Sequence, residues 1–105
     1  MFATVTRTRA PQDEPLEVAT FAGETMLPWL RQIDGFEGLV MLSNTEGTTL
    51  VLSFWESREV AERHLDARVR FRDRITAAVN VEIEDVTDYE VTFADLGSWP
   101  PREPA

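Results

Sequence analysis

The stretch FEGLVMLSNTEGTTLVLSFW, residues 36–55, decides the fold of this chain. Its first eight residues are mostly apolar, as in a largely buried strand. Residues 48–55 alternate, with Leu50, Leu52 and Phe54 on one face and Val51, Ser53 and Trp55 on the other. Residues 44–47 (NTEG) carry the asparagine and glycine of a tight turn. We therefore expect an antiparallel hairpin of strands 36–43 and 48–55.

The residues before the hairpin predict a strand and then a helix. Residues 2–9 alternate strictly and are rich in β-branched side chains, with Phe2, Thr4, Thr6 and Thr8 on one face. A helical face follows, with apolar residues three or four apart: Leu16, Ala19, Ala22, Met26, Leu30 and Ile33. Asp13 or Glu14 can cap this helix, Pro28 should kink it, and Gly35 suits its end.

The residues after the hairpin predict a second helix and a last strand. Ser57 is a good N-cap, and the helical stripe comprises Val60, Ala61, His64 and Leu65. The apolar spacing then changes, which predicts a kink or break near residues 66–70, before helical spacing resumes at Phe71. Residues 81–93 read as a strand whose phase slips, so we expect a β-bulge near Asp85. The proline-rich residues 94–105 predict an irregular tail.

The expected order is β-α-β-β-α-β in a chain of 105 residues. This pattern is typical of an α+β, ferredoxin-like sandwich, a four-stranded antiparallel sheet with both helices on one face. We expect one domain, residues 1–93, and a separate C-terminal tail. Because apolar side chains occur on both faces of the strands, we expect a second copy of the chain to cover the free face, giving a homodimer.

The composition excludes several classes of chemistry. The chain has no cysteine and one histidine, His64, so thiol catalysis, iron–sulfur clusters and multi-histidine metal sites are excluded. All ten basic residues are arginine, against 19 acidic residues, and the net charge of −9 disfavours nucleic acid and anionic membranes as partners. No apolar run is long enough to cross a bilayer and no signal peptide is visible, so we expect a cytoplasmic protein.

Three stretches together resemble the antibiotic biosynthesis monooxygenase (ABM) domain family. Residues 30–38 (LRQIDGFEG) resemble the family's PGF-x-G entry to the second strand, residues 50–57 (LVLSFWES) its W-E/D-S exit from the third, and residues 88–91 (DYEV) its last strand. The resemblance covers residues 2–93 and implies a dimeric α/β barrel. Some members are cofactor-free oxygenases that convert polyketide phenols to quinones, and others cleave haem. It therefore implies a monooxygenase of small aromatic or polyketide-type substrates, without a cofactor.

The chain departs from the family at positions that carry chemistry. The tryptophan of the W-E-S exit is kept as Trp55, but the quinone-forming group's asparagine and tyrosine are replaced by Val51 and Ala61. Arg74 lies one position from that group's arginine. In the haem-cleaving group, His64 takes the place of a tryptophan and Arg74 lies near the haem-ligating histidine. Two alternatives therefore stay open, a non-catalytic ligand-binding or structural dimer and a haem-binding or haem-degrading protein.

The candidate site combines aromatic, basic and hydroxyl side chains around the second helix. As catalytic candidates we take Trp55, His64 and Arg74; as substrate-binding candidates we take Ser53, Phe54, Arg68, Phe71 and Arg72. Aromatic rings can stack on an aromatic ligand, an arginine can hold a phenolate, carboxylate or propionate, and a histidine can accept a proton near neutral pH. The competing interpretation is core packing for the rings and a solvated, charge-paired helix face for the arginines. We expect no metal site.

Overall fold

The computed structural model describes the backbone of residues 1–10 and 15–96 and the side chains of residues 1–10 and 20–96. Along the chain the elements are β1 (Phe2–Arg9), α1 (Pro15–Leu30), β2 (Phe36–Ser43), β3 (Thr48–Trp55), α2 (Arg58–Arg63), α3 (Leu65–Ala78) and β4 (Glu82–Glu90). The predicted caps Asp13 and Glu14, and the predicted tail beyond residue 96, lie outside the described residues.

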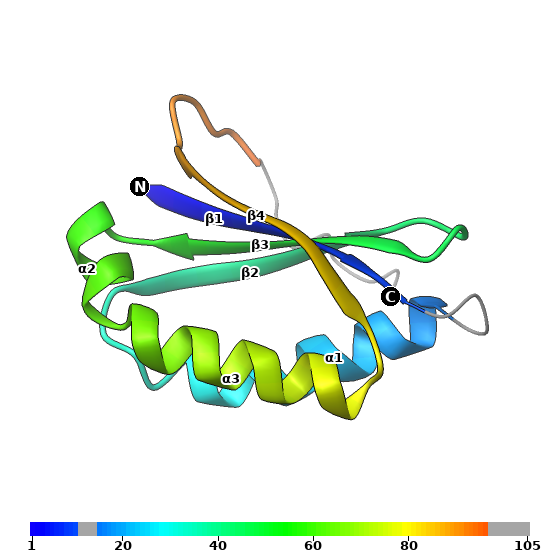
Figure 1. The fold of residues 1–105 in the computed structure, drawn as a ribbon. Helices are drawn as coiled ribbons and strands as arrows, with labels where there is room; N and C mark the ends of the chain where they lie inside the picture. Colours follow the sequence, from blue (N-terminus) through cyan, green and yellow to red (C-terminus); the bar gives the residue numbers. More distant parts are fainter. Residues whose placement is uncertain (11–14, 97–105) are drawn as a thin grey trace, which may run out of the picture.

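The four strands form one antiparallel sheet in the order β2-β3-β1-β4, with β1 and β3 in the centre. Figure 1 shows α1 and α3 lying against one face of this sheet, while no helix of the described residues lies on the opposite face. This arrangement confirms the predicted α+β, ferredoxin-like fold. It also divides the strand residues into a helix-facing set and a set on the open face.

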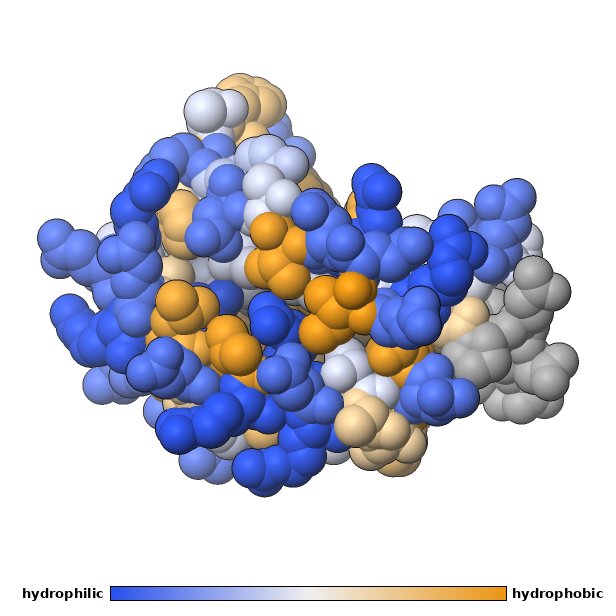
Figure 2. All heavy atoms as spheres, in the orientation of Figure 1, coloured by the Kyte–Doolittle hydropathy of each residue, from blue (hydrophilic) through white to orange (hydrophobic). Residues whose placement is uncertain are grey.

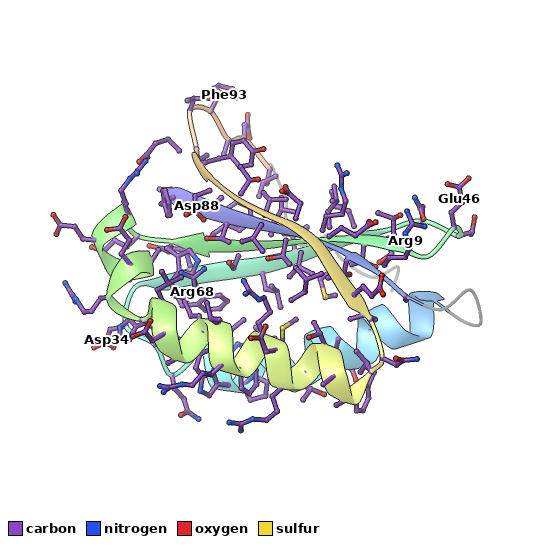
Figure 3. All side chains as sticks on the ribbon, in the orientation of Figure 1. Arg9, Asp34, Glu46, Arg68, Asp88 and Phe93 are labelled. Atoms are coloured by element: carbon purple, nitrogen blue, oxygen red, sulfur yellow. The ribbon has the colours of Figure 1, made fainter. Side chains whose placement is uncertain are left out.

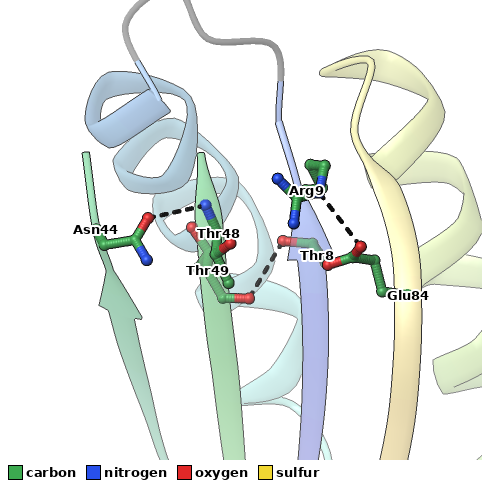
Figure 4. A network of polar contacts seen from close by, with 6 residues as sticks. All are labelled: Thr8, Arg9, Asn44, Thr48, Thr49 and Glu84. Carbon is green, nitrogen blue, oxygen red and sulfur yellow. Dashed lines mark hydrogen bonds and ion pairs between the residues drawn. The ribbon is translucent and has the colours of Figure 1, made fainter. Parts of the chain in front are cut away.

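The predicted hairpin of β2 and β3 is confirmed. Its turn is closed by the Asn44 side chain, whose Oδ1 accepts hydrogen bonds from the backbone N–H of Glu46 (2.9 Å) and Thr48 (3.1 Å). Gly47 adopts φ +94°, a left-handed conformation that a glycine tolerates without steric cost. Figure 4 shows this end of the sheet, where the Arg9 Nε–H donates to Glu84 across the edge pair at 3.2 Å.

The last strand contains the predicted bulge. The register between β1 and β4 shifts between Arg7, which faces Asp85, and Thr8, which faces Ile83. One extra residue on β4 therefore stands opposite a continuous β1, as the phase slip in the sequence indicated. The strand is shorter than the predicted 81–93, ending at Glu90, although the backbone N–H of Val91 still donates to Met1 at 2.9 Å.

The break in the second helix occurs earlier than predicted. Ser57 is the N-cap of helix α2, and its hydroxyl accepts a hydrogen bond from the Val60 N–H at 3.2 Å; His64, with φ −106° and ψ 14°, is the C-cap. Helix α3 then runs unbroken through residues 66–70. The prediction was wrong because it took the alternation of apolar residues with arginines in residues 67–72 as a loss of helical spacing. In the structure Arg68 and Arg72, one helical turn apart, both line the space between α3 and the sheet.

The tightest packing lies at one end of the sheet. Trp55 is fully buried, and Phe2, Leu30 and Ala61 join it in one cluster. Phe36 contacts the Trp55 ring edge-on, with 5.5 Å between ring centroids. Gly35, at φ +90°, leads the chain from α1 into β2, and a Cβ there would lie 2.5 Å from a Val60 methyl carbon. This packed end anchors the start of α3 and leaves looser space further along the helix.

Candidate ligand pocket

A cavity of about 150 Å³ lies between the helix-facing side of the sheet and helices α1 and α3. We call it the sheet–helix pocket. Its walls are mostly apolar, and Figure 2 shows hydrophobic side chains gathered between β4 and α3, where Leu65, Val69 and Val86 line the pocket. Concave, largely apolar sites with a few placed polar groups are typical of small-molecule binding.

Alternate residues of β1 form a hydroxyl-bearing floor. Because side chains alternate along a strand, Thr4, Thr6 and Thr8 all face the helices, and all three are buried. The Thr8 hydroxyl donates to the carbonyl of Thr49 at 3.4 Å. Within residues 1–10 and 20–96 the Thr6 hydroxyl has no hydrogen-bond partner, so it remains available to a ligand.

Arg68 forms hydrogen bonds both to the floor of the pocket and to the backbone of α2. Its Nη1 donates to the Ala61 carbonyl at 2.7 Å and its Nη2 donates to the Thr4 hydroxyl at 2.9 Å. Thr4 in turn donates to Asp88 Oδ1 at 2.9 Å. Figure 3 shows Arg68 rising from α3 towards the sheet, below Asp88. Both terminal nitrogens of Arg68 are therefore engaged within the protein.

The charge of Arg68 is held in a partly dry environment. Burial lowers the pKa of its guanidinium, the nearby Asp88 carboxylate raises that pKa, and the positive charge of Arg72 lowers it. The guanidinium also lies 4.4 Å from the Trp55 ring centroid, a favourable cation–π contact. Arg68 is thus a positioning residue that joins α3 to β1 and β3.

An aromatic pair spans the two helices at the pocket wall. Trp29 of α1 and Phe71 of α3 stack with their centroids 4.4 Å apart and their planes 13° from parallel. Met26 and Met41 complete this side of the lining. Flat rings and flexible thioethers form a surface that suits an aromatic ligand.

Arg72 is the one guanidinium of the pocket without a hydrogen bond to the described part of the chain. Its Nε is buried and unpaired. Asp73 Oδ1 lies 3.7 Å away, close enough for an ion pair but too far for a hydrogen bond. Because a buried polar atom without a partner destabilises the protein, this group requires an explanation.

The pocket gathers five of the eight residues that the sequence singled out: Ser53, Trp55, Arg68, Phe71 and Arg72. The Ser53 Oγ accepts a hydrogen bond from the indole N–H of Trp55 at 3.0 Å, so this hydroxyl helps to hold the Trp55 ring.

The other three candidates lie away from the pocket. Phe54 pairs with Ala3 and Gly38 on the open face. His64 sits in the break between α2 and α3, and Arg74 is exposed on α3; neither lines the pocket.

Three residues of the pocket lining were missed by sequence reasoning. Trp29 belongs to the apolar face of α1, three residues after Met26, and that spacing could have found it. Thr6 was assigned to the correct strand face but not to a site. Asp88 is one of several acidic residues in β4, and only its pairing with Thr4 across β1 and β4 distinguishes it.

The described residues contain neither a metal-binding cluster nor a membrane-spanning helix. They contain no group of three or more histidine, cysteine, aspartate or glutamate side chains that could hold a metal ion. None of their helices is long and apolar enough to cross a membrane.

The fold has close counterparts among solved structures. A candidate antibiotic biosynthesis monooxygenase from Deinococcus radiodurans superposes with a TM-score of 0.67 at 18% identity, covering 90% of this chain and 96% of that one. The ActVA-Orf6 monooxygenase of Streptomyces coelicolor, solved with nanaomycin D, gives 0.67 at 16% identity, covering 92% of each chain. A variant of SnoaB, a cofactor-independent oxygenase from Streptomyces nogalater, gives 0.66 at 12%, covering 89% and 94%.

These likenesses define the fold class. No protein-family model and no curated protein sequence matches the chain. The structural neighbours share the fold of the antibiotic biosynthesis monooxygenases, which confirms the resemblance carried by residues 30–38, 50–57 and 88–91. At these identities the chain has the ABM fold, and its activity has to be argued from the pocket.

Proposed function

We propose that this protein is a cofactor-independent monooxygenase-like protein that binds a small aromatic substrate in the sheet–helix pocket. The observation that carries the proposal is the pocket itself: an aromatic wall, a hydroxyl floor and an arginine with an unpaired nitrogen around one small cavity. The fold that it shares with ActVA-Orf6 and SnoaB supports the same conclusion.

The pocket's residues suit a phenol as the reacting group. A ring would lie against the Trp29–Phe71 wall, and Arg72 would stabilise the phenolate form, because a nearby positive charge lowers the pKa of an acid. A phenolate is electron-rich and can be oxidised by molecular oxygen. In the simplest case one atom of the O2 molecule becomes the oxygen of the second quinone carbonyl. The other atom takes up two hydrogens from the phenol and leaves as water.

Oxygen uptake tests this function directly. We would follow dissolved oxygen with a panel of phenols and hydroquinones, subtracting the rate without protein. We expect uptake above that background, reduced about tenfold or more in Arg72→Gln and unchanged in Arg70→Gln, an exposed arginine on the same helix. No uptake with any member of the panel would contradict the oxygenase proposal.

A non-catalytic ligand-binding protein is the second candidate. It is favoured by Val51, which lines the pocket where the quinone-forming oxygenases have an asparagine, and by the position of His64 outside the pocket. This candidate predicts saturable binding of an aromatic ligand without oxygen uptake. The cavity volume of about 150 Å³ does not favour haem. Drug-sized ligands already occupy pockets of about 300–1,000 Å³, and haem is larger than they are.

We also propose that the chain forms a homodimer through the open face of the sheet. That face carries half-buried apolar side chains that the helices do not cover: Val5, Val40, Leu50, Leu52 and Phe54. Large apolar patches on a soluble protein commonly mark association surfaces. Because the sheet–helix pocket lies on the other side of the sheet, each chain would keep a complete pocket.

A further inference from the structure

We propose that the ligand of the sheet–helix pocket is a single-ring aromatic monoanion, a phenolate or carboxylate, with its charge at Arg72. This inference rests on the proposed function, since it takes the pocket as a site for an aromatic molecule. It adds two properties that the fold does not specify, the size of the ligand and the sign of its charge.

The size follows from the cavity. Its volume is about 150 Å³. An apolar protein cavity of about that volume accommodates one benzene molecule. Ligands of several fused rings belong with pockets of about 300 Å³ or more. The stacked Trp29 and Phe71 form the wall against which one such ring would lie.

The charge follows from a count of the ionisable groups that line the cavity. These are Arg68, Arg72 and Asp88, so the lining carries two positive charges and one negative charge. The single carboxylate is linked through Thr4 to Arg68. The Arg72 charge has no partner among the lining residues, since its neighbour Asp73 lies 3.7 Å away outside the lining with 63% of its side chain exposed, in a chain whose net charge is −9. An anionic ligand would neutralise it.

The geometry of Arg72 points to the same ligand. Its Nε is buried without a hydrogen bond, and only 28% of its side chain is exposed. Its positive charge also lowers the pKa of Arg68, which means that the two guanidinium groups repel each other. A carboxylate or phenolate oxygen beside Arg72 would relieve that repulsion and supply an acceptor for its unpaired donors.

The uncharged part of the ligand has its own contacts. A ring that extends from Arg72 meets the wall of Trp29 and Phe71, and a second polar substituent can reach the Thr6 hydroxyl, which has no partner within the described chain. A single-ring acid with one further hydroxyl, such as 4-hydroxybenzoate, therefore matches the lining.

Isothermal titration calorimetry with the full chain tests the inference. The probes are benzoate, its neutral isostere benzamide, and the three-ring anion anthracene-2-carboxylate. We expect benzoate to bind about tenfold or more tightly than either of the others. In Arg72→Gln the benzoate affinity should fall to that of benzamide, while the benzamide affinity stays within about twofold. The matched variant Arg70→Gln should bind all three probes as the wild type does.

The outcomes separate this inference from the proposed function. Three results would overturn the single-ring anion and still leave an aromatic-binding pocket. Benzoate and benzamide could bind equally, the three-ring anion could bind most tightly, or Arg72→Gln could have no effect. Binding of none of the probes by a protein that gives a cooperative unfolding transition would overturn both. Circular dichroism of each variant keeps a folding defect from being read as lost binding.

Discussion

The Arg68 guanidinium lies over the Trp55 ring, 4.4 Å from the ring centroid, and so occupies one face of the indole. Trp55 is fully buried, and its indole N–H is satisfied by Ser53. The tryptophan that the sequence motif singles out is therefore a member of the core that positions Arg68. The pocket extends from there along α3 to Phe71 and Arg72.

Replacing Arg68 with methionine should destabilise the fold. The substitution keeps most of the chain length but removes the hydrogen bonds to Ala61 and Thr4 and the cation–π contact with Trp55. We expect a loss of about 1–3 kcal/mol in the free energy of unfolding, measured by urea denaturation. Arg70→Met, at an exposed position of the same helix, should change it by less than about 0.5 kcal/mol. Equal stabilities of the two variants would refute the positioning role of Arg68.

Two glycines of the same motif should respond differently to alanine. Gly35→Ala places a Cβ at φ +90° and 2.5 Å from a Val60 methyl carbon, so we expect a loss of about 2–4 kcal/mol. At Gly38 a Cβ would have nothing within 4 Å, so Gly38→Ala should be neutral or slightly stabilising. Urea denaturation of both variants measures this contrast. A larger loss in the free energy of unfolding for Gly38→Ala than for Gly35→Ala would contradict this geometry at the entry to β2.

Removing the carboxylate of Asp88 should strengthen anion binding. Asp88→Asn keeps a group that can accept the Thr4 hydroxyl but removes the only negative charge that lines the pocket in the described chain. We expect benzoate affinity to rise about fivefold, equivalent to roughly 1 kcal/mol, with benzamide affinity unchanged. Glu82→Gln, at an exposed position outside the pocket on the same strand, serves as the control in the calorimeter. A fall in benzoate affinity would mean that the anion does not sit near Arg72.

A charge placed on the open face should dissociate the proposed homodimer. Leu52 lies in the centre of that face, between Val5 and Val40, so Leu52→Glu would bury a carboxylate in the interface. Light scattering should give the mass of two chains for the wild type and of one chain for the variant. Ala77→Glu adds the same charge to an exposed position of α3 and should stay dimeric. A wild-type mass of one chain would contradict the dimer.

The parts of the fold with a simple period were predictable from sequence. The alternation of residues 2–9 and 48–55 sets strand, face and register together, and the phase slip near Asp85 locates the bulge. The helix break was misplaced because Arg68 and Arg72 face inward. Arginine on an inner helix face breaks the polar–apolar rule on which helical periodicity depends. The acceptors provided by Thr4 and Ala61, together with the Trp55 ring, stabilise the inward position of Arg68.

The candidate site was only partly predictable, because the sequence does not show directly towards which side of the sheet or helix a side chain points. Phe54 and Trp55 are neighbours in sequence, yet adjacent strand residues point to opposite faces, so a single pocket cannot hold both. His64 appeared to continue a helical stripe, but the chain leaves the helix at that residue. Asp88 looks like the other acidic residues of its strand, and its role depends on Thr4, which lies 84 positions earlier in the chain.

The central claim, that a small aromatic anion binds between the sheet and the helices, is tested most directly by a methyl NMR titration with 4-hydroxybenzoate. Side-chain alternation gives the experiment its internal control, since Thr6, Met26 and Met41 line the pocket while Val5, Leu50 and Leu52 lie on the open face. We predict saturable shifts for the first three methyl-bearing residues and none for the other three. Shifts confined to the open face, or no saturable shift at all, would contradict the account.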